Sequence, residues 1–217
     1  MESDIVNAPL VIALTGLPSS GKGEAAKALQ AAAARDGRAV GHLTFSDQIK
    51  EEARRRGVAQ ESFTREMLSR IGIEMREAEG PGVLSARIAG RIRDWPAPRP
   101  AIFVADGLRH TGEIDELRRA FGERFILVSV EAEPSEIARR LIARNRTDES
   151  PDALRSEAHA IRLLEQELNG QLSALGPNVG LCARQADLRL PNHGTLEELQ
   201  RRVGKLYEGL RGRMNCE

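Results

Sequence analysis

The sequence has few cysteines, no long hydrophobic run and no excess of charge of either sign. Only two of its 217 residues are cysteines, Cys182 and Cys216, which is too few for a disulfide framework and does not match metal-ligand spacing. The first apolar stretch, residues 8–14, is interrupted by Pro9 and is too short to cross a membrane. The residues before it are acidic, unlike a signal peptide. These absences predict a reduced, cytoplasmic protein without a membrane partner.

Positive and negative charges balance, since 32 Lys and Arg residues face 32 Asp and Glu residues. A general nucleic-acid binder needs a clear excess of positive charge, so we do not expect nucleic acid as a partner. Only four of the basic residues are lysines, and each lysine is therefore more informative than usual. The length suits one core, and no repeat or linker divides the chain, so we expect a single domain over 1–217. Composition carries no information on the oligomeric state.

Five apolar runs rich in β-branched residues alternate with helical patterns along the chain. Continuous apolar strands that alternate with helices are typical of a parallel sheet covered on both faces, which places the chain in the α/β class. The expected strands are Leu10–Thr15, Arg38–Phe45, Ala101–Ala105, Phe125–Val130 and Ala186–Leu190.

The connection between the second and third expected strands is much longer than an ordinary crossover. Residues 46–93 contain several helical patterns: a short helix that Ser46 or Asp47 can cap, a longer one over Ser62–Glu79, and a third that ends near Arg93. An insertion of this length usually has its own role. Downstream, helices are expected over Pro134–Arg146, over Pro151–Asn169 and from a capping box at Thr195 onward.

The strongest motif is Gly16-Leu-Pro-Ser-Ser-Gly-Lys22, which fits G-x-x-x-x-G-K. Its glycines let backbone N–H groups turn toward a phosphate chain, and its lysine reaches the β- and γ-phosphates. About 0.03 matches are expected by chance at this composition. An apolar strand precedes the motif and an alanine-rich helix follows it, as a P-loop requires. The phosphate-binding candidates are Gly16, Ser19, Ser20, Gly21, Lys22, Gly23 and Glu24.

Two carboxylates are candidates for contact with Mg²⁺. Gly23 and Glu24 stand where many P-loops have a metal-binding Ser or Thr, so direct ligation by a hydroxyl after Lys22 is missing. Glu24 is a candidate for contact with the ion through water, and the alternative is a carboxylate that favours the helix N-terminus. Asp106 ends the apolar run Ala101–Ala105, as in a Walker B element, where such an acid holds Mg²⁺ or orients an acceptor. The alternative for Asp106 is the start of a turn.

These stretches resemble P-loop kinases of small phosphorylated molecules. The run Gly16-x-Pro-x-x-Gly-Lys-Gly23 resembles the P-loop of adenylate kinase and other nucleoside monophosphate kinases. The stretch 186–199 is similar to the final strand and helix of dephospho-coenzyme A kinases. The stretch 65–76, together with Asp106-Gly-Leu-Arg109, resembles deoxynucleoside monophosphate kinases and archaeal adenylate-kinase-like proteins. Glu24 departs from this pattern, because the family has Thr there.

The resemblance implies a P-loop NTPase three-layer sandwich with a five-stranded parallel sheet in the order 2-3-1-4-5. It also implies that 46–93 is an acceptor-binding insertion and that 140–152 is the lid. Lid arginines, here Arg140, Arg144 and Arg146, would then neutralise the transferred phosphoryl group, although a solvated helix face explains them equally well. Arg109 is better placed at the end of a strand. The candidates for contact with the acceptor are Asp47, Arg65, Arg76 and Arg87.

The sequence therefore favours an enzyme that transfers a phosphoryl group from ATP, with Mg²⁺, to a small phosphorylated acceptor. A (deoxy)nucleoside monophosphate is the first choice of acceptor, and dephospho-coenzyme A is the alternative. A nucleotide-binding regulatory protein with little turnover is a second class, suited to the missing Ser or Thr but not to an acceptor lobe. A nucleic-acid end kinase would need a basic channel, which the zero net charge disfavours.

Overall fold

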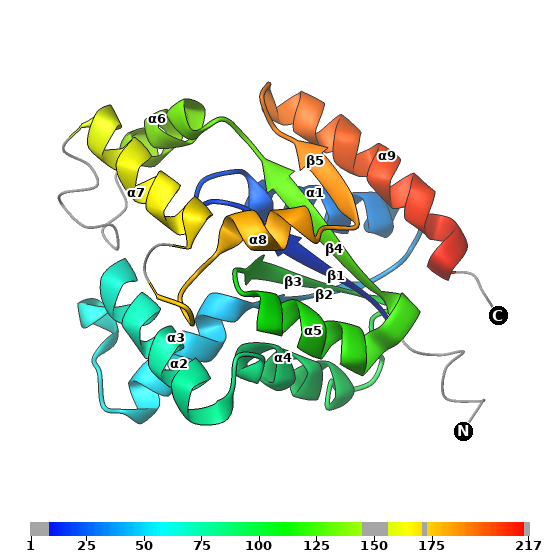
Figure 1. Cartoon of the computed structure of the whole chain (residues 1–217). Helices are drawn as coiled ribbons and strands as arrows, with labels where there is room; N and C mark the ends of the chain where they lie inside the picture. Colours follow the sequence, from blue (N-terminus) through cyan, green and yellow to red (C-terminus); the bar gives the residue numbers. More distant parts are fainter. Residues whose placement is uncertain (1–8, 145–155, 171–172, 215–217) are drawn as a thin grey trace.

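The computed structural model describes residues 9–144, 156–170 and 173–214. Five parallel strands form one sheet in the order β2-β3-β1-β4-β5, which confirms the α/β fold class and the expected strand order (Figure 1). The strands are β1 (Leu10–Thr15), β2 (Val40–Thr44), β3 (Ile102–Leu108), β4 (Phe125–Glu131) and β5 (Leu188–Pro191).

Successive side chains of each strand point to opposite faces of the sheet, which divides the core into two layers. Leu10, Ile12 and Leu14 of β1 pack against α1 (Lys22–Arg35) and α9 (Leu196–Met214). The intervening Val11 and Ala13 face the opposite layer. That layer contains α2 (Phe45–Arg55), α3 (Arg65–Glu79), α4 (Val83–Arg93), α5 (Thr111–Phe121) and α8 (Val179–Arg184), with the short 3₁₀ turns Gln60–Ser62 and Gly122–Arg124 beside it (Figure 1).

A third apolar cluster lies beside the end of β1 and does not belong to either layer. It joins α6 (Pro134–Arg144), α7 (Glu157–Asn169) and α8 through buried side chains such as Ile137 and Leu164. Leu17 of the loop after β1 packs into the same cluster. The pair α6–α7 is therefore held against the P-loop by a small core of its own.

The observed helix caps confirm one expectation from the sequence and overturn another. Thr195 and Glu198 exchange backbone-to-side-chain hydrogen bonds of 3.2 and 3.3 Å, which confirms the capping box before α9. The expectation that Ser46 or Asp47 caps α2 is wrong. The cap is Thr44, whose Oγ1 accepts the Asp47 N–H at 3.0 Å, because β2 runs directly into the helix. Within the described residues, no helix has both the length and the apolar character that a membrane span needs.

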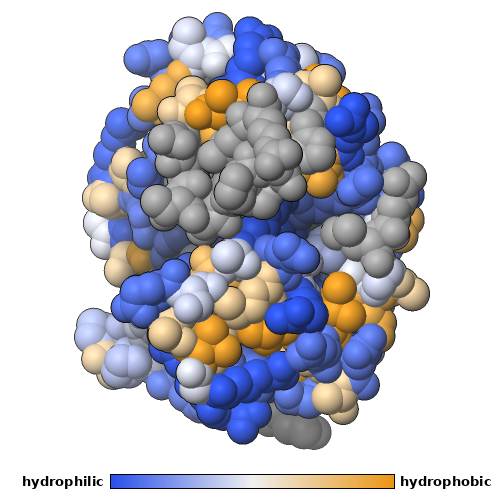
Figure 2. Space-filling model, turned by 90° about the vertical axis from the view of Figure 1, so that its left-hand side faces the viewer, coloured by the Kyte–Doolittle hydropathy of each residue, from blue (hydrophilic) through white to orange (hydrophobic). Residues whose placement is uncertain are grey.

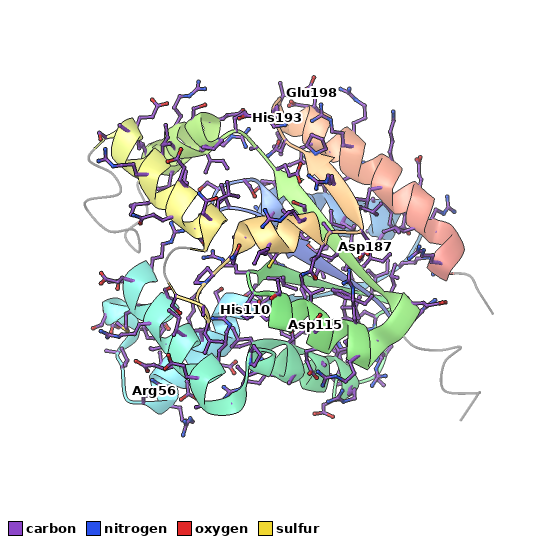
Figure 3. The ribbon with its side chains drawn as sticks, viewed as in Figure 1. Arg56, His110, Asp115, Asp187, His193 and Glu198 are labelled. Atoms are coloured by element: carbon purple, nitrogen blue, oxygen red, sulfur yellow. The ribbon has the colours of Figure 1, made fainter. Side chains whose placement is uncertain are left out.

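Glu113 organises the turn between β3 and α5. One of its carboxylate oxygens accepts the backbone N–H groups of Arg109 and His110, at 2.9 and 3.0 Å. The other accepts Arg76 of α3, at 2.6 Å from Nη2. The Arg76 and Glu113 side chains are only 4% and 1% exposed. This buried ion pair ties α3 to the turn that follows Asp106, and Figure 3 shows His110 where the chain enters α5.

Replacing Arg76 by Met is expected to lower the free energy of unfolding by about 3 kcal/mol or more, because Glu113 would remain buried without its counter-charge. Urea denaturation measures this loss. Arg118→Met is the matched control, since Arg118 pairs with Asp187 at the surface, where an ion pair contributes at most about 1 kcal/mol. Equal losses in the two variants would contradict a structural role for the buried pair.

Candidate functional site

The loop between β1 and α1 wraps around the ammonium group of Lys22. Lys22 is the first residue of α1 and is only 9% exposed. Its Nζ donates to the backbone carbonyls of Gly16 and Leu17, each at 2.9 Å. The loop thereby places a positive charge next to the N-terminal end of a helix, where backbone N–H groups favour an anion.

Two glycines of this loop are required by close contacts. A Cβ on Gly16 would lie 2.4 Å from the carbonyl oxygen of Val130, and one on Gly21 would lie 2.2 Å from Nδ2 of Asn192. Both glycines also have positive φ, at 145° and 104°. Asn192, in the loop after β5, donates to the backbone carbonyl of Ser20 at 2.7 Å and is buried. Asn192 therefore anchors the P-loop from the far edge of the sheet, a role that sequence reasoning missed.

The other P-loop candidates differ in their surroundings. Ser19 adopts a left-handed conformation, with φ of 59°, and Oγ of Ser20 is buried without a hydrogen-bond partner in the described part of the chain. A Cβ on Gly23 would meet no heavy atom within 4 Å, so that position has open space. Glu24 forms an ion pair with Lys27 at 2.9 Å.

The electrostatic environment makes the Lys22 ammonium easier to deprotonate. Burial lowers its pKa from 10.5 to about 8, and the positive charge of Arg109 adds to the effect. The carboxylates of Asp106 and Glu167 partly oppose it. These charges lie close enough to Lys22 to act on it, so the structure brings Lys22, Asp106 and Arg109 into one site.

The alternation of side chains along β3 directs Asp106 toward this site. It aligns with Leu14 of β1 and Thr44 of β2, and alternation places it on the face that α1 covers. Its Oδ1 is buried and has no hydrogen-bond partner among residues 9–144, 156–170 and 173–214. A buried carboxylate oxygen beside a phosphate-binding loop fits a hard cation or its bound water. The described residues contain no cluster of three or more His, Cys, Asp or Glu side chains suited to a metal, so phosphate and water would have to complete such a site.

Glu167 of α7 completes the charged cluster, and no motif in the sequence marks this residue. Its carboxylate accepts Arg109 at 2.7 Å and also pairs with Arg65 of α3. Burial opposes its ionisation, yet the charges of Arg109, Arg65 and Lys22 outweigh burial and lower its pKa. The structure therefore brings together Arg65 and Arg109, which lie 44 positions apart, through a residue from a third segment.

The remaining acceptor candidates have other partners. Arg76 belongs to the buried pair with Glu113. Arg87 pairs with Glu79 at 2.8 Å and lies 3.7 Å from Glu52, in a separate ion-pair group. Asp47 lies in the first turn of α2, at the edge of the sheet where β2 ends, and forms an ion pair with Lys50 at 3.5 Å.

The lid candidates are only partly described. Arg140 donates to Glu136 at 2.7 Å and to the backbone carbonyl of Asn192 at 3.2 Å, which places it beside the residue that anchors the P-loop. Arg144 ends α6, and its side chain lies outside the described residues. Arg146 and most of the expected lid, 140–152, also lie outside them. Their roles stay predictions.

Comparison with known proteins places this geometry in context. A family model described as an AAA domain matches residues 15–156. A UPF0200 protein of Pyrococcus horikoshii is 30% identical over 198 residues, which cover 91% of this chain and 95% of that protein. Another from Methanosarcina barkeri is 31% identical over 196 residues, or 89% and 91% of the two chains. The solved shikimate kinase from Acinetobacter baumannii, in complex with shikimate, aligns with a TM-score of 0.51 at 19% identity, over 95% and 97% of the chains.

The sheet order, the phosphate-binding loop and the matching family model define the class, which is a P-loop, kinase-like nucleotide-binding domain. The chain belongs to the UPF0200 family and to the family described as an AAA domain. The likeness to shikimate kinase concerns the fold alone, because the sequence identity is low.

The lowered pKa of Lys22 predicts a pH-dependent nucleotide affinity. Phosphate binding favours the ammonium form, so the contribution of Lys22 to ATP affinity is expected to be constant below about pH 7 and to fall by up to about tenfold per pH unit above pH 8. Calorimetric titrations between pH 6 and 9.5 test this expectation. Lys22→Arg is the control, since a guanidinium stays charged over this range and should remove the decline. An identical decline in both proteins would exclude Lys22 as its source.

Proposed function

We propose that the protein transfers a phosphoryl group from ATP to a small phosphorylated acceptor, and that the acceptor is a (deoxy)nucleoside monophosphate. The observation that carries this proposal is the convergence of two kinds of group at one edge of the sheet. Lys22 lies in a phosphate-binding loop, and two further guanidinium groups, from Arg65 and Arg109, lie within reach of its charge. The phosphate chain of a donor would use the loop and Lys22, and the phosphate of an acceptor would use Arg65 and Arg109.

The P-loop would hold the donor. Backbone N–H groups of residues 16–24 would bind the phosphates of ATP, and Lys22 would stabilise the charge that develops on the transferred group. Asp106 would be the protein contact of Mg²⁺, which when bound would supply positive charge that neutralises the phosphates. No covalent intermediate is needed, because positioning and electrostatic stabilisation suffice for phosphoryl transfer.

The helical insertion would hold the acceptor. Arg65 belongs to 46–93 and shares the carboxylate of Glu167 with Arg109, which follows β3. The carboxyl ends of the strands are where α/β sheets bind ligands. Guanidinium groups suit phosphate because their N–H groups match its oxygens in pairs. Arg140, beside the P-loop anchor Asn192, is our candidate for neutralising the transferred group, together with Arg144 and Arg146.

Two alternative functions can be distinguished from this proposal by experiment. Dephospho-coenzyme A would use the same donor site with a larger acceptor, in line with the resemblance of 186–199 to dephospho-coenzyme A kinases. A regulatory nucleotide-binding protein would bind ATP with little turnover, which suits the absence of a hydroxyl at Gly23. The pair formed by Arg65 of the insertion and Arg109 after β3 favours an enzyme, since a switch needs no second anion site.

A coupled assay of ADP release, run with ATP, Mg²⁺ and each nucleoside monophosphate or dephospho-coenzyme A, should identify one acceptor class. Lys22→Ala is expected to lower kcat by about 10²-fold or more and to leave the fold intact, because the lost ammonium acts mainly in the transition state. Lys205→Ala, which removes an exposed lysine, should behave like the wild type. ATP binding without turnover on any acceptor would support the regulatory alternative.

Asp106→Asn tests the metal contact. The variant should weaken Mg²⁺-dependent activity by about tenfold or more while ATP binding without Mg²⁺ changes little, since the lost charge would face the ion. Asp115→Asn makes the same change on the exposed side of α5 and serves as its control (Figure 3). If Asp106→Asn reduces binding equally with and without Mg²⁺, the residue does not contact the metal.

A further inference from the structure

Glu167 is a buried anion in a region that the proposed function requires to bind anions. Its side chain is only 4% exposed. Oε1 accepts a hydrogen bond from Arg109, and Oε2 accepts one from Arg65, so each carboxylate oxygen pairs with a different guanidinium group. With Lys22 and Asp106 nearby, the described residues of the cluster include three cations and two carboxylates. Without Glu167 it would carry a marked excess of positive charge, which is the condition that attracts a phosphate.

The ion pairs of Glu167 also connect two helices, α7 and α3, that belong to different apolar clusters. Its helix, α7, packs with α6 and α8 around an apolar cluster of their own. Arg65 begins α3, which packs in the layer with α2 and α4. Figure 1 shows α7 above α3, with both helices to the left of the strands in that view. In Figure 2, which views that side, the residues visible in the hollow between the upper and lower halves of the surface are mainly hydrophilic.

We propose that Glu167 is an intramolecular counter-ion that occupies the anion position of Arg65 and Arg109, and that an anionic group of the acceptor displaces it. This inference rests on the proposed function, because it assigns these two arginines to the acceptor. A carboxylate and a phosphate monoester offer the same kind of oxygen to a guanidinium, but the phosphate carries more charge and more oxygens. The exchange therefore replaces an internal ion pair by a stronger one to the ligand.

Two consequences follow from this exchange. The positive charge of the arginine pair is partly compensated by Glu167 in the free protein, so unrelated anions are disfavoured at this position. Acceptor binding also releases the link between α7 and α3, because the same guanidinium groups cannot serve both anions fully. Anion binding and the Glu167 ion pairs thus oppose each other, and by linkage each weakens the other to the same extent.

The test compares inorganic phosphate binding in charge-altered variants. The P-loop is first saturated with the non-hydrolysable analogue AMP-PNP and Mg²⁺, and phosphate is then titrated by calorimetry. Glu167→Gln keeps the size of the side chain and removes its charge, so phosphate should bind about tenfold or more tightly than to the wild type. Glu165→Gln, an exposed change on the same helix, should match the wild type. Arg65→Gln should bind phosphate more weakly.

Phosphate binding to Glu167→Gln that is equal to or weaker than wild-type binding would overturn the proposal, and weaker binding would make Glu167 a positioning residue for the arginines. Failure of AMP-PNP to bind the wild type would instead count against the proposed function. The comparison is then repeated without the analogue in a Lys22→Ala background, which removes the P-loop cation. In that background, phosphate affinity is compared between the protein with Glu167 and the Glu167→Gln variant. Tighter binding to Glu167→Gln supports the proposal and equal or weaker binding overturns it, and neither result depends on nucleotide binding.

A measurement on the wild type covers the case in which Glu167→Gln does not fold. Hydrogen exchange of residues 157–169 is followed with and without saturating phosphate, at constant ionic strength. Displacement of Glu167 should speed exchange in α7, because the helix loses its ion pairs to α3 and to the β3–α5 turn. Unchanged exchange, or slower exchange, in α7 would overturn the proposal.

Discussion

The compensation of buried charge is the constraint on which the site depends. Lys22 lies under the P-loop with almost no exposure, and an ammonium in such a place is stable only with carbonyl oxygens and carboxylates around it. Asp106 and Glu167 supply the carboxylates. Glu167 in turn requires Arg65 and Arg109, so one buried lysine leads to a network that reaches four segments of the chain.

The parallel sheet makes this network feasible. All five strands end at the same edge, so the loops after β1, β3 and β5 meet there although they are far apart in sequence. Asn192 fastens the P-loop from the β5 side, and Glu113 fastens the turn after Asp106 to α3. The hydrogen bonds around the site thus serve mainly to hold loops in position, which is what a reaction that relies on positioning needs.

The division of labour between fold and site explains how this chain can share a fold with shikimate kinase at 19% identity. The sheet and P-loop are common to the class, whereas an acceptor is chosen by side chains on the helical insertion and on α7. In this chain our proposal assigns that choice to two arginines, Arg65 and Arg109, with the carboxylate of Glu167 between them. Arg76, by contrast, supports the fold, since its charge is used within the buried pair with Glu113.

The sequence by itself determined the elements that depend on local patterns: the strands, their order through the family resemblance, the P-loop around Lys22, and the capping box at Thr195. It also indicated Asp106, because a strand end is a local signal. Only the tertiary structure decided that Asn192, Glu113 and Glu167 join the site, since a lone Asn or Glu on a helix or loop has no spacing that marks it. The partner of a buried charge is set by three-dimensional proximity, and Glu167 lies 58 residues from Arg109 and 102 from Arg65.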